Sequence, residues 1–511
     1  MIRVSELKLP VTGNQKALEK KLAKALRVPV EEIKAYRIFK RSLDARKKDN
    51  IHYAYVVDAE VKNENKILEK NKDKHISKTP DLAYHLPKGE NRPTKRPVVV
   101  GFGPAGMFAA LLLAEMGLQP IVLERGGDVD SRKQAVDTFW QTGKLDVESN
   151  VQFGEGGAGA FSDGKLNTGT KDPRHRFILE ELVSCGAPES ILMDAKPHVG
   201  TDMLHITLKN MRKKLLSLGA DIRFGHRLEG IETRQGQLTG ITVAHGEEIY
   251  ALPVRNLILA LGHSARDTVE RLYGQGLFME AKPFAVGVRI EHLQSRMDAV
   301  QYKEYAGHPA LPVSSYKLSC HLPDGRGVFS FCVCPGGQVV AAASEPRRTV
   351  TNGMSEYARS GENINGGLLV GVSPRDFGSD HPLAGIAFQR RLEEAAYRLG
   401  GGFTAPCQRV EDFLHHRPST GCVSVRPSYR PGVRYVDLHD CLPDFIAEAL
   451  EQALPLLDKK LPGFADGDAL LTAVESRSSA PVRIPRNEDY ESNITGLYPC
   501  GEGAGYAGGI L

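Results

Sequence analysis

RPVVVGFGPAGMFAALLLAEMGLQPIVLERG, residues 96–126, is the stretch that decides the fold of this chain. Val98 to Val100 form a short apolar run that predicts a buried strand, and the apolar residues 107–116 predict a helix that ends at a glycine. Residues 120–123 predict a second strand, which is followed directly by Glu124. The stretch therefore has the strand–helix–strand order of a βαβ unit.

Three glycines and one acidic residue in this stretch indicate what the unit binds. Gly101 permits a tight turn, Gly103 lets a pyrophosphate approach the backbone, and Gly106 lets helix and strand pack closely. The helix N-terminus offers free N–H groups to the phosphates. Glu124 lies 18 positions after Gly106, where it can accept hydrogen bonds from a ribose. The pattern predicts a Rossmann-type dinucleotide-binding unit.

Length and charge predict further domains. At 511 residues the chain is too long for one hydrophobic core, so we expect two or three domains. Residues 1–97 hold 24 Lys/Arg against 13 Asp/Glu, although the net charge of the whole chain is only +4. Strand-like stretches and a helix over residues 14–27 predict a small basic α/β domain here. Lys16, Lys20, Lys24 and Arg27 share one face of that helix, which is either a solvated face or a contact for nucleic acid or an acidic partner.

The sequence indicates a cytoplasmic protein without a membrane span or a metal site. The N-terminus has no apolar signal segment, and glycines and a proline interrupt the uncharged window 97–114. The eight cysteines include no C-x-x-C and no zinc spacing. Cys332 and Cys334 are the closest pair. Alternate residues of a regular strand face opposite sides, so we expect this pair to be structural rather than redox-active.

Two later segments resemble the cofactor contacts of glutathione-reductase-type flavoproteins. VRNLILALGHSARDT (254–268) is similar to the strand of that family that closes on a glycine. GLYPCGEGAGYAGGI (496–510) is similar to its late segment, with Glu502 where an aspartate is usual. The G-x-G-x-x-G pattern also occurs at 154–159 and 503–508, but without a complete βαβ unit. The resemblance implies FAD as the cofactor and an α/β fold with a Rossmann-type FAD-binding domain.

A narrower resemblance is to a bacterial family of FAD-dependent, or FAD-utilising, dehydrogenases whose substrate is unassigned. It is carried by NVQFGEGGAGAFSDGKLNTG (150–169), KPFAVGVRIEH (282–292), FCVCPGG (331–337), HPLAGIAFQRRLE (381–393) and ESRSSAPVRI (475–484). The domains expected are a small basic α/β domain at 1–75, a connector at 76–94, a discontinuous FAD-binding domain at 95–275 and 476–511, and a mainly β substrate domain at 276–475. We expect the chain to be cut short after the last FAD segment, where a further helix should begin.

The residues expected to contact the cofactor come from these segments. They are Gly101, Gly103, Pro104, Ala105, Gly106, Glu124, Arg125, Arg132, Gly156, Gly157, Gly159, Ser162, Lys165, Gly262, Gly501, Glu502, Gly508, Gly509 and Ile510. The early C-x-x-x-x-C pair of disulfide reductases is missing, which excludes dithiol chemistry of that kind. No second βαβ unit occurs between residues 170 and 480, so NAD(P)H is expected only as a transient electron donor.

For catalysis the sequence offers candidate residues rather than a pattern. They are His263, Arg289, Tyr316, Lys317, Arg477 and Arg483. His263 directly follows a strand that should end near the cofactor, and Arg477 is a candidate for binding an anion or for pairing with Glu475. The leading hypothesis is an FAD-dependent oxidoreductase that transfers a hydride between an unknown small organic substrate and flavin N5. The alternatives are a flavin-dependent monooxygenase and an RNA-associated flavoprotein that uses the basic N-terminal domain; the oligomeric state stays open.

Overall fold

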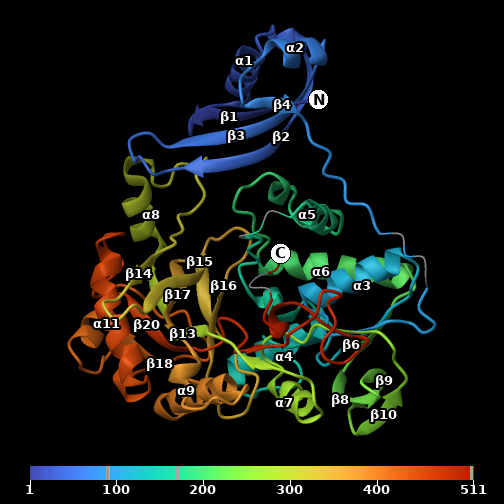
Figure 1. The fold of residues 1–511 in the computed structure, drawn as a ribbon. Helices are drawn as coiled ribbons and strands as arrows, with labels where there is room; N and C mark the ends of the chain where they lie inside the picture. Colours follow the sequence, from blue (N-terminus) through green and yellow to red (C-terminus); the bar gives the residue numbers. More distant parts are fainter. Residues whose placement is uncertain (88, 90–91, 169, 171, 507–509, 511) are drawn as a thin grey trace.

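Figure 1 shows the chain, a computed structural model that describes residues 1–87, 89, 92–168, 170, 172–506 and 510. The N-terminal unit is an antiparallel sheet with strand order β2-β3-β1-β4. Its elements are β1 (Ile2–Pro10), α1 (Gln15–Leu26), β2 (Ile33–Asp44), β3 (His52–Val61), α2 (Glu64–Lys70) and β4 (Ile76–Lys78). Helix α1 starts after Asn14, whose side chain accepts a hydrogen bond from the Ala17 amide, and it buries Leu18, Leu22 and Leu26.

A five-stranded parallel sheet contains the fingerprint of residues 96–126. Its strands are β5 (Val98–Val100), β6 (Ile121–Glu124), β7 (Asp221–Phe224), β11 (Leu257–Leu259) and β22 (Leu497–Pro499), in the order β22-β11-β5-β6-β7. Helix α3 (Pro104–Glu115) connects β5 to β6, as predicted for the βαβ unit. A Cβ added at Gly106 would lie 1.9 Å from the carbonyl oxygen of Gly101, so α3 can pack on the turn after β5 only because position 106 is glycine.

The second large sheet has eight strands and is mainly antiparallel. In sheet order they are β14 (Ser319–His321), β15 (Gly327–Ala341), β17 (Asn363–Val372), β13 (Phe284–Leu293), β20 (Leu470–Glu475), β18 (Ala405–Arg409) and β19 (Val433–Tyr435), with β16 (Thr351–Met354) paired to β15. The apolar sides of α9 (Ala384–Gly400) and α11 (Asp444–Asp458) pack against it and share its core.

The remaining elements connect or cover these sheets. They are α4 (Val129–Thr142), η2 (Gly157–Phe161), α5 (Arg174–Ser184), α6 (Thr201–Ser217), β8 (His226–Arg234), β9 (Gln237–His245), β10 (Glu248–Leu252), α7 (Arg266–Gly274), β12 (Glu280–Ala281), α8 (Gln294–Tyr302), α10 (Val410–Leu414), β21 (Val482–Arg483) and η7 (Glu502–Ala504). The mixed α/β class is confirmed. Within the described residues, every helix is too short or too polar to cross a bilayer.

The N-terminal unit contacts both larger parts of the molecule through β2, β3 and the turn between them (Figure 1). Arg41 of β2 forms an ion pair of 2.7 Å with Asp194, in the segment between α5 and α6. The hydroxyl of Tyr53 in β3 donates to the carbonyl of Ala310, 2.7 Å away, after α8. The unit therefore bridges the part that holds the parallel sheet and the part that holds the eight-stranded sheet.

Candidate functional site

The glycine-rich segments identified in the sequence meet at one edge of the parallel sheet. They follow β5, β11 and β22, which are adjacent and parallel, so the chain leaves all three strands at the same edge. A Cβ at Gly501 would lie 2.8 Å from the Cβ of Ala105, and a Cβ at Gly503 would lie 2.3 Å from the carbonyl oxygen of Gly262. Ligands of open α/β sheets bind outside the carboxyl ends of the strands, so this edge is the candidate cofactor site.

The first turn of α3 opens toward this edge. Gly103 is the N-cap residue, Pro104 begins the helix, and no described side chain caps the turn. A Cβ added at Gly103 would have the Gly157 backbone as its nearest described neighbour, 3.6 Å away. At Gly262, whose φ is +69°, an added Cβ would meet no described atom within 4 Å. An uncapped helix N-terminus with space in front of it fits a phosphate, and so these residues fit the pyrophosphate of FAD.

Glu124 contacts three backbone amides of the site. Its Oε2 accepts from the Phe102 amide at 2.8 Å, and its Oε1 accepts from the amides of Gly126 and Gly154, both at 2.9 Å. The carboxylate thus connects the β5–α3 turn to the glycine loop that starts at Gly154. Oε2 has a second lone pair, so the predicted ribose contact stays a prediction alongside this structural role.

Arg132 and Arg125, both predicted to contact the cofactor, are engaged with protein groups. The fully buried guanidinium of Arg132 donates to four main-chain carbonyls within residues 150–155, at 2.7–3.4 Å. Burial lowers its pKa to about 10. Arg125 forms 2.9 Å ion pairs with Glu148 and Asp267. The geometry therefore favours a structural role for each arginine, because both guanidinium groups bind protein groups of neighbouring segments.

The glycine loop lies directly over the fingerprint. The Gly156 amide donates to the carbonyl of Phe102 at 2.8 Å. Gly157 has a φ of +59°, and a Cβ added there would lie 3.0 Å from the Cα of Gly103. Since Gly103 begins α3, the loop and the phosphate-facing turn are in backbone contact, and a side chain at Gly157 would separate them.

The last cofactor segment closes the same region. A Cβ added at Gly159 would lie 3.5 Å from Ile510. Burial raises the pKa of Glu502 to about 7, and the nearby charge of Lys282 acts in the opposite direction. A carboxyl group with this pKa exists in both protonation states near neutral pH, so Glu502 can both accept and donate a hydrogen bond. Two further predicted contacts, Gly508 and Gly509, lie outside the described residues.

Ser162 and Lys165 follow the loop and are also engaged. The Ser162 hydroxyl donates to a loop carbonyl at 2.7 Å. Lys165 pairs with the buried carboxylate of Asp163 at 2.9 Å and donates to the carbonyl of Val333 in β15. Asp163 also accepts from Nε of Arg359 at 2.9 Å. Lys165 therefore connects the glycine loop to the eight-stranded sheet; its contact with a cofactor stays a prediction.

His263 lies directly after β11, as predicted. Its Nδ1 is 2.8 Å from the hydroxyl of Ser264. Burial, followed by the charges of Arg477 and Arg266, lowers the pKa of His263 to about 3. The imidazole is therefore neutral at physiological pH. A group with this pKa is a poor acceptor and a poor source of a proton, so a hydrogen-bonding role of His263 is favoured over proton transfer.

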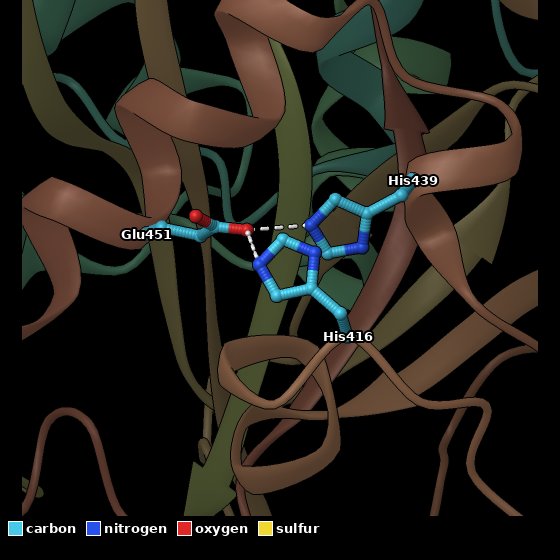
Figure 2. A group of neighbouring side chains, drawn as sticks. All are labelled: His416, His439 and Glu451. Carbon is cyan, nitrogen blue, oxygen red and sulfur yellow. Dashed lines mark hydrogen bonds and ion pairs between the residues drawn. The ribbon is translucent and has the colours of Figure 1, made fainter.

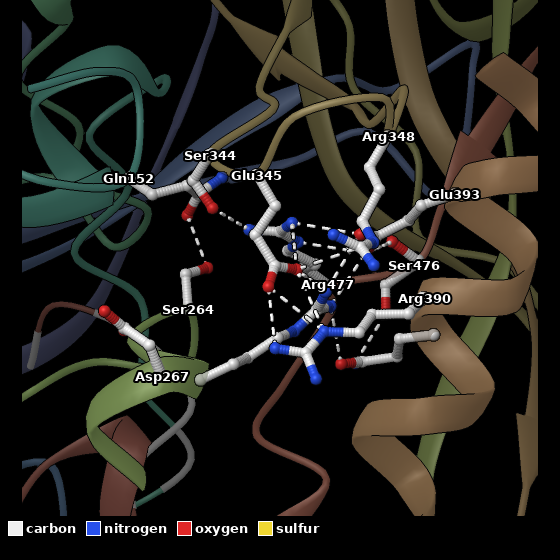
Figure 3. A network of polar contacts seen from close by, with 12 residues as sticks. Gln152, Ser264, Asp267, Ser344, Glu345, Arg348, Arg390, Glu393, Ser476 and Arg477 are labelled. Atoms are coloured by element: carbon white, nitrogen blue, oxygen red, sulfur yellow. Dashed lines mark hydrogen bonds and ion pairs between the residues drawn. The ribbon is translucent and has the colours of Figure 1, made fainter. Parts of the chain in front are cut away.

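A buried ionic network lies beside His263 (Figure 3). Glu393 of α9 is fully buried and binds both Arg266, at 2.7 Å, and Arg477, at 3.0 Å. The predicted pairing of Arg477 with Glu475 is wrong, because the Arg477 guanidinium lies against Glu393 while Glu475 pairs with Arg289 at 2.9 Å. Arg483 lies apart from this network, with its guanidinium 4.9 Å from the Tyr506 ring centroid.

The predicted substrate-facing groups of the eight-stranded sheet have different environments. Arg289 is fully buried and binds Glu475, Asn365 and the carbonyl of Cys332, so its charge is satisfied by protein groups. Tyr316 is also buried, and its hydroxyl has no hydrogen-bond partner among the described residues. Lys317, the next residue, is exposed. The structure thus does not bring these three side chains together toward one substrate.

One further polar cluster lies far from these glycines in the sequence. Figure 2 shows His416, His439 and Glu451, whose potential ligand atoms all lie within 4.8 Å of one another. Glu451 accepts from Nε2 of His439 at 2.6 Å and pairs with Nε2 of His416 at 3.1 Å, and Asp437 lies 2.6 Å from Nδ1 of His439. Both carboxylates raise the pKa of His439 against the effect of burial. These contacts between histidines and carboxylates explain why the side chains lie together.

Two family models match parts of the chain. Residues 283–478 match the family described as FAD-dependent protein, C-terminal domain-like. Residues 1–60 match a domain of unknown function, DUF8436. An uncharacterized protein of Clostridium beijerinckii is 49% identical over 514 residues, which cover 100% of this chain and 96% of that protein. The family match supports FAD as the cofactor.

Solved structures of flavoproteins have weaker similarity to the chain. The glycerol-3-phosphate dehydrogenase of Bacillus halodurans, complexed with FAD, is 12% identical, covers 83% of this chain and 63% of its own, and has a TM-score of 0.34. A flavin-dependent brominase is 12% identical, covers 80% of this chain and 72% of its own, and has a TM-score of 0.35. An anhydrotetracycline hydroxylase of Streptomyces rimosus is 14% identical, covers 80% of this chain and 56% of its own, and has a TM-score of 0.30.

Proposed function

Because this chain belongs to the same family as the Clostridium beijerinckii protein and carries the FAD-dependent C-terminal region, we propose that it is an FAD-dependent oxidoreductase. In this proposal the enzyme transfers a hydride between a small organic substrate and flavin N5. The parallel sheet with its glycine turn is then the Rossmann-type domain that holds the dinucleotide. The eight-stranded sheet covers the flavin ring and supplies the substrate side.

One observation carries this proposal: the segments after β5, β11 and β22 converge on the uncapped N-terminus of α3. An extended dinucleotide needs a phosphate site and further backbone along its length, and glycines provide both because they lack side chains. At Gly262 an added Cβ would meet no described atom within 4 Å, which leaves space for such a ligand, and at Gly103 the backbone itself is free of a side chain. A sheet edge that binds no ligand would not require this space.

When bound, FAD supplies hydride chemistry at N5, and the residues of the chain bind it, orient it and exclude water. The first turn of α3 binds the pyrophosphate through its N–H groups. Glu502, whose pKa is raised to about 7, can hold a proton for the reaction near neutral pH. His263 stays neutral beside Arg266 and Arg477, and it can form a hydrogen bond to a substrate hydroxyl.

The test is flavin retention by purified protein with a substitution at the phosphate site. We expect Gly103→Val to abolish the visible flavin absorbance, because its side chain fills the space in front of α3. Gly274→Val, at an exposed position of α7 with no described atom within 4 Å of an added Cβ, is the matched control and should retain flavin. Full flavin content in Gly103→Val, with an unchanged circular dichroism spectrum, would show that the phosphate site lies elsewhere.

The reaction class is tested by anaerobic reduction. We expect a metabolite from a library, or NADH or NADPH, to bleach the flavin without oxygen and to yield a dehydrogenated product. An enzyme that releases an oxygenated product, with one oxygen atom from O₂, would be a monooxygenase and would contradict hydride transfer as the complete reaction.

A further inference from the structure

Cys332 and Cys334 adopt a geometry in β15 that a regular strand does not allow. The pairing of β15 with β17 shifts register between Phe331 and Cys334, and Cys332 has a φ of +41°. The expectation that the two side chains face opposite sides assumed a regular strand, and this shift removes that condition. Both thiols are free, and Sγ of Cys334 donates to the Cys332 carbonyl at 3.3 Å.

Two cationic side chains hold this bulge. Nη2 of Arg289 donates to the carbonyl of Cys332 at 2.7 Å and lies 3.7 Å from Sγ of Cys334. Nζ of Lys165 donates to the next carbonyl, that of Val333. Arg289 is itself held by Glu475 at 2.9 Å. Charged groups from β13, β20 and the glycine loop thus fix a pair of thiols that the sheet alone would separate.

The electrostatics give the two sulfur atoms different states. Hydrogen bonding from Cys334 lowers the pKa of Cys332, and Lys165 and Arg289 act in the same direction against burial. Hydrogen bonding to Cys332, together with burial, raises the pKa of Cys334. Cys332 is partly exposed and Cys334 is buried. An accessible thiolate beside a protonated thiol is the reactive form of a dithiol, because the thiolate is the nucleophile.

The pair lies next to the candidate cofactor site. Lys165 belongs to the segment that follows Gly157, and Gly157 contacts the start of α3. On the other side, the charge of Cys332 contributes to the raised pKa of Glu502, so Cys332 lies within electrostatic reach of the segment after β22. Cys332 is therefore between two of the segments that line the flavin in the proposed function.

We propose that Cys332 and Cys334 form a redox-active dithiol that exchanges two electrons with the flavin bound beside them, an inference that rests on the proposed function. In the oxidative direction, a bond forms between the two sulfur atoms and the S–H bond of Cys334 breaks. Two electrons and that proton pass to oxidised flavin, which becomes the reduced anion. The charge before and after the step is the same, because the Cys332 thiolate supplies the negative charge.

The first test counts electrons in the intact holoprotein. Anaerobic titration of the oxidised protein with dithionite should consume about four electrons per FAD, two for the flavin and two for the disulfide. Cys334→Ser should consume about two. Cys407→Ser removes a buried thiol of β18 in the same sheet and should still consume about four. Consumption of about two electrons by the wild-type protein would overturn the proposal, even if a variant failed to fold.

The second test needs no flavin. After incubation of the flavin-free protein with glutathione disulfide, the tryptic peptide of residues 327–347, whose only cysteines are 332 and 334, should lose the mass of two hydrogen atoms.

Without oxidant, iodoacetamide should modify Cys332 faster than Cys334. The rate of modification of Cys332 should be half-maximal below about pH 7 rather than near the usual thiol pKa of about 8.5. A peptide that stays in the dithiol form in glutathione disulfide overturns the proposal. A protein that retains no FAD but forms the disulfide refutes the proposed function instead.

Discussion

Replacing Glu393 by Gln removes a fully buried carboxylate that two buried guanidinium groups share. Glu393 accepts five hydrogen bonds, two from Arg266, two from Arg477 and one from the hydroxyl of Ser476. Burial alone would raise the pKa of Glu393, but the two arginines hold it well below its ordinary value. The glutamine keeps the shape and loses the charge, so Glu345 is left as the acidic partner of both arginines.

The size of the effect follows from burial. Breaking a buried ion pair at one partner costs about 3–5 kcal/mol, because the other charge stays buried without compensation. Helix α9 supplies a matched control at the next position: Glu394 is 46% exposed and pairs with Arg348 at 2.7 Å. A surface pair of this kind contributes about 0–1 kcal/mol. We therefore expect Glu393→Gln to lower the free energy of unfolding by at least about 2 kcal/mol more than Glu394→Gln does.

Urea unfolding measures this difference, with two probes. Trp140 is the only tryptophan of the chain, and its indole N–H donates to the carbonyl of Ala341 in β15 at 2.9 Å. Its fluorescence reports the contact between α4 and the eight-stranded sheet, while circular dichroism reports the whole chain. Midpoint and slope give the free energy for each variant. Equal destabilisation by Glu393→Gln and Glu394→Gln would refute the reasoning that the buried network, rather than α9 itself, needs the carboxylate.

Two further predictions concern charge. The pKa of His439 is raised above its unfolded value of about 6.5, so its contribution to stability is fully present below about pH 6.5 and is lost as pH rises through the folded pKa. Urea unfolding of His439→Gln should thus differ from wild type more at pH 6 than at pH 9, and a constant difference would contradict the pKa direction. If the exposed face of α1 binds RNA, the triple substitution Lys16→Glu, Lys20→Glu and Lys24→Glu should abolish salt-sensitive retention on RNA, whereas Lys213→Glu, Lys303→Glu and Lys317→Glu, with the same charge change at exposed positions, should not. Equal retention of both triple variants would dismiss the RNA hypothesis.

Local patterns predicted the parts of the fold that depend on local geometry. The fingerprint of residues 96–126 predicted β5, α3 and β6. Its glycine spacing and apolar runs reflect contacts within this one stretch of the chain. The helix expected over residues 14–27 is likewise close to the observed bounds of α1. The same patterns could not assign long-range partners. Arg477 was a candidate for binding an anion or for pairing with its neighbour Glu475, but its partner is Glu393, more than eighty positions away.

Buried charges and strand irregularities were the main features that the sequence did not predict. Glu393 occurs in the charged run QRRLEEAA, which is typical of an exposed helix, although its helical spacing from Gln389 and Ala396 places it on the buried side. The bulge at Cys332 arises from Arg289 and Lys165, which bind consecutive carbonyls from other elements. The alternation of side-chain direction along a regular strand does not predict those contacts with other elements. The predictions for Arg132 and Arg125 had the same limit, because their partners lie in other segments, within residues 148–155 and in α7.

The pairing of β11 with β22 has a consequence for how the protein is made. Strand β11 ends at residue 259 and its neighbour β22 begins at residue 497, with the whole eight-stranded sheet between them in the sequence. During synthesis, the ribosome releases β5, α3 and β11 long before the segment that packs Gly503 on Gly262. The nascent chain therefore has an exposed sheet edge and an incomplete cofactor site until residues 497–503 have been synthesised. Cofactor loading must follow synthesis of β22, so flavin supply acts on the chain only after that point.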